Sequence, residues 1–305
     1  MIKRPMFTVF TPTYNRLHTL SRVYESLKQQ TYQDFEWLIV DDGSSDGTNY
    51  MVGQWQKEGL FTIRYFYQKN KGKHTAYNLA IEHALGELFV TLDSDDAFFL
   101  KDSLRIVYDD WIVCLNTQPN KLAGLLYLSC FANGKIIGTK FPRDVIDGRI
   151  FDINDRFRVS GDKITFILTS IAVQYPFPVF PDELFCPEGL VWNRISRDYL
   201  FRHINTVIQL VEYQPDGLSA NSFLVRKRSK NGTILYYSEV FLLPLSKFAI
   251  IRNYANLYRF CLHYRKKVPH IIGEISFFYI AVSALLGLGL YYKDCVTERW
   301  SAQCF

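Results

Sequence analysis

The sequence has few of the short motifs by which metal and nucleotide sites are recognised. Its six cysteines include no Cys-x-x-Cys pair, and His74 has no second histidine at ligand spacing, so we expect reduced, mostly buried thiols and no zinc site. Gly-x-x-x-x-Gly-Lys does not occur, and no Gly-x-Gly-x-x-Gly follows the first predicted strand. Nucleoside triphosphate hydrolysis and dinucleotide binding are therefore unsupported.

A secretory leader is also missing from the beginning of the sequence. Residues 1–6 lead directly into a strand-like run, without the apolar segment and small-residue cleavage site of a signal peptide. On this basis we expect the chain to stay in the cytoplasm.

Positive charge is concentrated in one part of the chain. Residues 226–267 hold ten Lys or Arg and a single acid, Glu239, which gives a local charge of +9 in a protein whose net charge is +5. Such a segment is expected to face an anionic partner, either a membrane surface or nucleic acid.

Apolar β-rich runs alternate with helical periodicity through the first 115 residues. The runs are residues 7–10, 36–40, 63–67 and 88–92. The helical faces are formed by Leu20, Val23, Tyr24 and Leu27, by Ala76, Leu79, Ala80 and His83, and by Leu104, Val107, Tyr108, Trp111 and Leu115. This alternation predicts an α/β fold with a mostly parallel central sheet flanked by helices.

The pattern weakens between residues 116 and 220. Residues 124–131 and 135–138 are predicted to pair as strands, residues 175–187 to form a proline-rich loop, and residues 189–194 a helix. We expect one domain over 1–220, in two halves (1–115 and 116–220), and a basic, helical, partly apolar C-terminal extension over 221–305.

Within that extension, one predicted helix has an apolar face and a separate basic face. Its apolar residues are Phe248, Ile251, Ala255, Tyr258 and Leu262, and its basic residues, seven apart, are Arg252, Arg259 and Lys266. A basic amphipathic helix is typical of a membrane surface. Residues 275–292 then carry no charge over eighteen residues, the lower limit for a membrane span. A buried hairpin or an interfacial helix remains an alternative, since the segment includes Gly287 and Gly289.

Acidic residues follow two of the predicted strands. Asp41 and Asp42 come after the second, and Asp93-Ser94-Asp95-Asp96 comes after the fourth. Because ligands bind outside the carboxyl ends of the strands in open α/β sheets, these carboxylates can hold a divalent cation that neutralises a diphosphate. The alternative is a solvated acidic turn that caps the next helix.

Two neighbouring loops also have competing interpretations. Residues 42–47 have the beginning of a calcium loop, but Gly53 stands where the bidentate Glu is required, which excludes that site. Residues 71–74, Lys-Gly-Lys-His, begin a predicted helix, where cations and a flexible backbone can meet phosphate. The alternative for residues 71–74 is a basic, solvated turn.

Several motifs in order resemble the opening of glycosyltransferase family 2. They are residues 7–16, 30–36, 40–48, 70–78, 84–87 and 93–96, and together they cover about residues 6–115. A weaker match lies at residues 187–194, where Glu188 stands at the position of the family's Asp. The resemblance implies the GT-A nucleotide-sugar fold, with donor binding in 1–115 and acceptor binding in 116–220.

The resemblance also implies roles for individual residues. Thr11, Pro12 and Tyr14 would line the nucleotide pocket, Asp42 would accept a hydrogen bond from the base ring N–H, and Asp41 would support the loop. Lys73 or His74 would contact the phosphates, and Asp93 would contact the ribose or sugar. Asp95, with Asp96 as second candidate, would bind Mn or Mg. Glu188 would be the catalytic base, with Asp182, Glu183 and Asp162 as alternatives.

By the same resemblance, the expected activity is inverting transfer of a hexose or N-acetylhexosamine from a nucleotide sugar, UDP-linked, to a glycan or lipid-linked acceptor. The basic and apolar segment 226–292 favours a peripheral location at the cytoplasmic face of a membrane, and nucleic acid is not an expected partner. Two alternatives remain: a nucleotide-sugar-binding protein without turnover, and a nucleotidyltransferase.

Overall fold

The computed structural model describes residues 4–117, 122–218, 220–269 and 275–303. The chain forms two compact units, Met1–Phe177 with Arg194–Ala220, and Pro178–Asn193 with Asn221–Phe305. One limit, between Ala220 and Asn221, coincides with the division predicted from sequence. The division into a catalytic domain and an extension stays a prediction.

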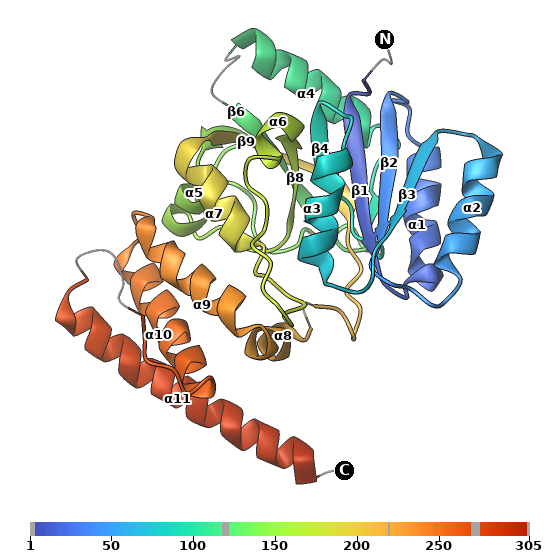
Figure 1. Cartoon of the computed structure of the whole chain (residues 1–305). Coiled ribbons are helices and arrows are strands. Elements are labelled where there is room, and N and C mark those ends of the chain that lie inside the picture. The colour runs from blue at the N-terminus through green and yellow to red at the C-terminus, as the bar shows by residue number, and fades with distance from the viewer. Residues whose placement is uncertain (1–3, 118–121, 219, 270–274, 304–305) are drawn as a thin grey trace. The chain divides into compact units, whose positions relative to one another are not determined.

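The first unit alternates strands and helices along its N-terminal part (Figure 1). Its elements are β1 (Phe7–Thr13), α1 (Leu17–Lys28), β2 (Phe35–Asp41), α2 (Thr48–Glu58), β3 (Thr62–Tyr67), α3 (Lys73–His83), β4 (Leu88–Thr91), β5 (Ala97–Phe98), α4 (Ser103–Thr117), β6 (Leu122–Cys130), β7 (Val145–Gly148), α5 (Ile150–Arg156), β8 (Lys163–Leu168), α6 (Thr169–Ala172) and β9 (Leu200–Leu210).

The strands form one sheet in the order β3-β2-β1-β4-β8-β6-β9-β5, with β7 also paired to β9. The predicted α/β class is confirmed. β3, β2, β1 and β4 are parallel, as are β6 and β9, whereas β8 runs antiparallel to both β4 and β6. The parallel part is the part in which helices alternate with strands, because a parallel connection needs a crossover.

The predicted pairing of residues 124–131 with 135–138 is confined to the end of β6. There Cys130 forms a bridge with Ile136, the Phe131 N–H donates to the Lys135 carbonyl and the Ile137 N–H donates to the Ser129 carbonyl, and the rest of the predicted pairing is wrong. Instead β6 lies between β8 and β9. All nine of its residues are buried, as expected for a central strand that is covered on both faces. A hairpin partner on one side would leave the backbone hydrogen-bonding groups on the other edge of this buried strand without partners.

Opposite faces of the parallel strands pack against different helices. Phe7 and Val9 of β1 belong to a core cluster shared with the buried faces of α1, α2 and α4. Phe10, from the other face of β1, packs edge-to-face on Tyr77 of α3. The buried face of α3 consists of His74, Thr75, Ala76, Tyr77, Ala80 and Ile81. Leu79 and His83, which the periodicity placed on this face, are only partly buried.

The second unit is helical. Its elements are α8 (Ser222–Arg228), α9 (Lys230–Glu239), the 3-10 helix η1 (Val240–Leu242), α10 (Lys247–His263) and α11 (Phe277–Gln303), and α7 (Gly189–Asp198) begins in it and ends in the first unit. The loop predicted before α7 is confirmed, since residues 173–188 contain neither helix nor strand.

The predicted faces of α10 are partly wrong. Its buried side includes Asn253, Leu257 and Phe260, whereas Phe248 is exposed. Arg259 is not part of a solvated basic stripe, because its Nε and Nη2 atoms each donate to the Asp294 carboxylate of α11 at 2.6 Å. The charged pair joins the two helices and removes one of the three basic residues from the expected membrane-facing stripe.

The apolar segment predicted at residues 275–292 is a continuous helix rather than a hairpin. Within α11, Phe277–Thr297 is long and apolar enough to cross a membrane, with a mean hydropathy of 1.2 over the most apolar stretch, and only 17% of that stretch is buried. Such length and composition are weak grounds for a span. They do show that α11 presents apolar side chains that its own unit leaves uncovered.

We predict that Gly124→Ala destabilises the protein and that Gly53→Ala, its matched control, does not. A Cβ at Gly124 would lie 1.9 Å from the carbonyl oxygen of Phe166 in the adjacent strand, whereas one at Gly53 would meet nothing within 4 Å. The expected changes in the free energy of unfolding are a loss of about 3 kcal/mol and, in the interior of α2, a gain of about 1 kcal/mol. Urea denaturation measures both, and equal effects would contradict the strand packing.

A second prediction concerns His203, which is completely buried in β9. Burial lowers its pKa from 6.5 to about 4, so the folded protein keeps the ring neutral while the unfolded chain protonates it below pH 6.5. Its stabilising contribution is full above pH 6.5 and is lost as the pH falls toward 4. We expect a loss on the order of 2 kcal/mol, smaller in His203→Phe, measured by denaturation at successive pH values. An unchanged pH profile in the variant would contradict this.

Candidate functional site

The first unit has a topological switch point beside β1. The chain passes from β1 to β2 and β3 on one side and then returns to place β4 on the other side of β1. In open α/β sheets, ligands bind outside the carboxyl ends of the strands at such a point. Thr11 and Pro12 lie near the end of β1, Tyr14 follows it, and Asp93 follows β4. The sequence-predicted residues from these two strands therefore share one edge.

Asp42, at the end of β2, holds the segment that follows β3. One carboxylate oxygen accepts from the Gln68 amide (2.6 Å) and the Lys71 N–H (2.8 Å), and the other accepts from the Gly72 N–H (2.8 Å). Asp42 is buried, and burial raises its pKa while these hydrogen bonds lower it, with a net rise. A carboxylate has about four lone-pair sites, so a further acceptor position remains for a base N–H.

Asp41 has the loop-supporting role that was predicted for it. One of its oxygens accepts from the Ser44 N–H at 2.7 Å, and the other accepts from the Tyr65 hydroxyl at 2.6 Å. The two adjacent acids therefore divide between two loops. Asp41 holds the loop after β2, and Asp42 holds the loop that begins α3.

Lys73, the first residue of α3, reaches the end of β4. Its Nζ lies 2.8 Å from Oδ2 of Asp93. This ion pair places the N-terminus of a helix, where anions are favoured, beside the acidic segment. His74 is buried next to it, and burial lowers the pKa of its ring to about 4. His74 is therefore neutral at pH 7 in the protein without ligand, which makes Lys73 the stronger cationic candidate of the two.

The acidic segment combines burial with mutual repulsion. Burial and the nearby charge of Asp93 raise the pKa of Asp95. Asp96 is more deeply buried, and burial together with Asp93 and Asp95 raises its pKa to about 9. Clustered carboxylates with raised pKa values are typical of functional sites, because a solvated acidic turn has no reason to hold like charges out of water.

Two residues that the sequence did not single out hold Asp96. The Gln209 amide donates to Oδ2 of Asp96 at 2.7 Å, and the oxygen of that amide accepts from the Ser129 hydroxyl at 2.7 Å. Both lie outside the family motifs, on strands β9 and β6, and no local pattern marks them. Gln68 was also missed, although its place directly after β3 at the same edge could have indicated it.

Three buried polar atoms at this edge have no hydrogen-bond partner among the described residues. They are Oγ1 of Thr13, Nδ1 of His74 and Oδ1 of Asp93. Buried polar atoms are almost always hydrogen-bonded, so such a group of exceptions indicates a site completed by a ligand or by water.

These features fit a divalent cation. Repulsion among Asp93, Asp95 and Asp96 favours a positive charge between them, and carboxylate oxygens are the ligands that Mg²⁺ and Mn²⁺ prefer. Among the described residues no group of three or more His, Cys, Asp or Glu has metal-site spacing. Asp95 and Asp96 would therefore hold a cation jointly with oxygens of a bound diphosphate, as is usual for Mg²⁺.

The candidate bases have different surroundings. Glu188 is exposed immediately before α7 and belongs to the second unit, as do Asp182 and Glu183. The oxygens of Glu183 accept from the Asn231 and Gly232 N–H groups at 2.7 and 2.9 Å, which gives it a capping role at α9. Asp162, in the first unit, accepts from the Tyr213 hydroxyl at 2.6 Å. The choice of Glu188 stays a prediction.

The strand order and the helices that cover the sheet define an α/β fold of the GT-A type. Residues 8–111 match the model of "Glycosyl transferase family 2". This part of the chain belongs to glycosyltransferase family 2, as its motifs predicted.

A curated relative is the Escherichia coli protein "UDP-Glc:alpha-D-GlcNAc-diphosphoundecaprenol beta-1,3-glucosyltransferase WfgD", with 30% identity over 124 residues, which is 37% of this chain and 48% of that protein. The matches to the first curated relatives each span less than half of the relative's length. The similarity is therefore to a domain, and activity and substrates do not follow from it alone.

Two solved structures share the fold. S. aureus TarS 1-349 in complex with UDP-GlcNAc has a TM-score of 0.61 and 18% identity, over 85% of this chain and 72% of that one. The mannosyltransferase PcManGT from Pyrobaculum calidifontis in complex with GDP-Man and Mn²⁺ has a TM-score of 0.54 and 18% identity, over 97% and 81%. At this identity the likeness establishes the fold alone.

We predict that Asp42→Ala lowers the free energy of unfolding by about 3 kcal/mol, because the buried N–H groups of Lys71 and Gly72 lose their acceptor. Hydrogen exchange should accelerate at the amides of residues 71 and 72 before it does in β1. Chemical denaturation and hydrogen-exchange mass spectrometry measure the two effects. Unchanged protection at these amides would show that Asp42 does not hold the loop.

Proposed function

We propose that this protein is an inverting, metal-dependent glycosyltransferase that moves a sugar from a UDP-linked donor to a hydroxyl of a lipid-linked glycan. The observation that carries the proposal is the acidic segment Asp93–Asp96 at the switch point, beside Lys73 and the N-terminus of α3. Positive and negative groups placed together at a strand end suit a nucleoside diphosphate, whose phosphates and cation need both.

The donor is assigned to the edge formed by β1, β2 and β4. Thr11, Pro12 and Tyr14 line the nucleoside side, and Asp42 accepts from a ring N–H of the base, which suits uracil or thymine. Asp93 contacts the ribose or sugar, and Lys73 lies against the phosphates. WfgD, whose name gives UDP-Glc as its donor, supports a UDP-linked donor.

The proposed reaction is a direct displacement. The acceptor hydroxyl attacks the anomeric carbon while the bond from that carbon to the diphosphate oxygen breaks, so the configuration inverts. Glu188 takes the hydroxyl proton, and Lys73 lies beside the negative charge of the departing diphosphate. Asp95 and Asp96 would hold a divalent cation, which when bound would further stabilise that leaving group.

The lipid-linked acceptor is supported by the name of WfgD, which describes a glucosyltransferase for a diphosphoundecaprenol-linked sugar. The exposed apolar side of α11 and the basic residues between 226 and 267 support a peripheral location at the cytoplasmic membrane surface. Both features lie in the second unit, whereas the strands that form the proposed donor site belong to the first.

The test is hydrolysis and transfer with UDP-glucose and UDP-N-acetylglucosamine in the presence of Mn²⁺. We expect activity that EDTA abolishes and that Asp95→Ala lowers at least a hundredfold in kcat/KM, because the leaving group loses charge compensation. The control is Asp109→Ala, an exposed acid of α4 paired only loosely with Arg105 at 3.9 Å; its activity should be unchanged.

Other outcomes would replace the proposal. Metal-dependent UDP binding without turnover would favour a binding protein, and pyrophosphate release from a nucleoside triphosphate would favour a nucleotidyltransferase. Full activity of Asp95→Ala in EDTA would exclude the metal-dependent mechanism.

A further inference from the structure

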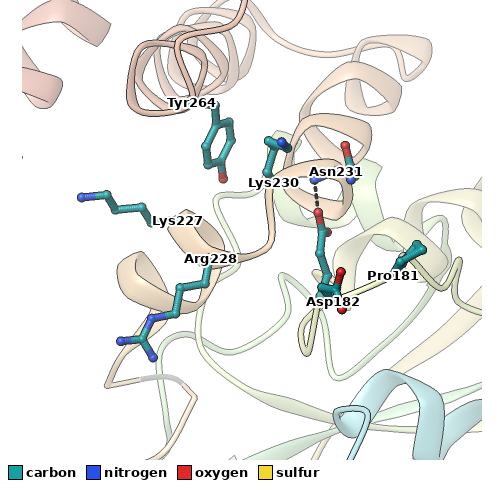
Figure 2. Close-up of a pocket in the computed structure, with 8 residues that line it drawn as sticks. Pro181, Asp182, Lys227, Arg228, Lys230, Asn231 and Tyr264 are labelled. Atoms are coloured by element: carbon teal, nitrogen blue, oxygen red, sulfur yellow. Dashed lines mark hydrogen bonds between the residues drawn. The ribbon is translucent and has the colours of Figure 1, made fainter.

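The second unit contains a basic pocket that the proposed donor site does not use. It has a volume of about 410 Å³ and is lined by Pro181, Asp182, Glu183, Lys227, Arg228, Lys230, Asn231 and Tyr264 (Figure 2). Three of these side chains are cationic, and they come from the end of α8 and the beginning of α9. The lining therefore carries three positive charges on long side chains, whose head groups point in different directions in Figure 2.

The two acidic residues of the lining, Asp182 and Glu183, offset the positive charge of the pocket to different extents. Glu183 is buried, and its carboxylate caps α9 through the N–H groups of Asn231 and Gly232, where the dashed line in Figure 2 marks the Asn231 bond. The positive end of the α9 dipole compensates that carboxylate. Asp182 is then the one remaining acid of the lining against Lys227, Arg228 and Lys230, so the lining has a net positive charge.

The pocket lies at the C-terminal end of α10, beside one part of α11. Tyr264, which ends α10, lines the pocket, and its hydroxyl donates to the carbonyl of Arg226 in α8. The preceding residue, His263, contacts Tyr291 of α11 and lies 2.9 Å from Asp294. The C-terminal end of the uncharged stretch of α11 is therefore adjacent to the part of α10 that reaches the pocket.

The uncovered apolar side chains of α11 precede that level. They include Phe277 (82% exposed), Phe278, Leu285, Leu286, Leu288 and Tyr292. Tyr291, Tyr292 and Lys293 then form the kind of aromatic and basic boundary that is found where hydrocarbon meets head groups. A lipid tail along this helix would place its head group near the same level as the basic pocket.

We propose that this pocket binds the diphosphate of the lipid carrier on which the acceptor glycan is built, with the carrier's hydrocarbon along the apolar side of α11. Arg228 and Lys230 bind the diphosphate oxygens, and several cations around one dianionic group give preference over singly charged head groups. This inference rests on the proposed function, since it assigns the acceptor's carrier to the second unit.

The experiment measures binding of farnesyl diphosphate to the full chain by calorimetry, with the donor site saturated by UDP and Mn²⁺. The pocket variant is Arg228→Gln with Lys230→Gln. Its matched control is Lys266→Gln with Lys267→Gln, which removes the same charge from exposed residues of the same unit outside the pocket. We expect at least tenfold weaker binding in the pocket variant and a change of less than twofold in the control.

A vesicle arm separates the pocket from general attraction to anionic surfaces. Sedimentation with phosphatidylglycerol vesicles should weaken by the same factor in both double variants, because it depends on summed charge. Any of four results would overturn the proposal. They are equal loss of farnesyl diphosphate binding in both variants, no loss in either, no binding by the unaltered chain, and selective loss of vesicle binding in the pocket variant.

The measurements distinguish a failure of the pocket assignment from a failure of the proposed function. UDP affinity and donor hydrolysis should be unchanged in the pocket variant, which also shows that it folds, while KM for a lipid-linked acceptor rises at least tenfold. If hydrolysis and transfer are absent from the unaltered protein, the proposed function fails even where farnesyl diphosphate binds. If transfer proceeds with an unchanged acceptor KM in the pocket variant, only the pocket assignment fails.

Discussion

The carboxylate of Asp42 is the interaction on which the candidate site depends. It joins the end of β2 to Gln68 after β3 and to the N–H groups that precede α3. Because α3 begins at Lys73, this connection sets where the Lys73 side chain lies, and Lys73 meets Asp93 at the end of β4. One buried acid thereby positions groups that come from three separate strands and a helix.

Like charges lie close together at the same edge of the sheet. The charge of Asp93 raises the pKa of Asp95, and Asp93 and Asp95 raise the pKa of Asp96, whose carboxylate Gln209 holds in a buried position. The charge of Lys73 offsets this repulsion at Asp95 and Asp96, and the charge of Arg16 offsets it at Asp95. A site of this kind is more stable with a bound cation than without one, so ligand binding and local stability are coupled.

Local sequence patterns predicted the parts of the fold that local interactions determine. Leu20, Val23, Tyr24 and Leu27 form the buried face of α1 as their spacing indicated, and the four N-terminal strands occur where the apolar runs are. The pairing of β6 with β8 and β9 was not predictable in this way, because its partners lie tens of residues along the chain. Acids at strand ends were visible in the sequence, whereas Gln209 and Ser129, which hold Asp96, become neighbours of it only through the sheet.

The pair formed by Arg259 and Asp294 limits how α11 can meet a bilayer. The stretch Phe277–Thr297, which is long enough to cross a membrane, includes Lys293 and Asp294. Its uncharged part, from Phe277 to Tyr292, has sixteen residues, about 24 Å at 1.5 Å per residue, against the roughly 30 Å of a hydrocarbon core. A perpendicular crossing would draw Lys293 and the charged pair out of water. An orientation along the surface leaves both in the head-group region, and α10, tied to α11 by that pair, would be held at the same depth.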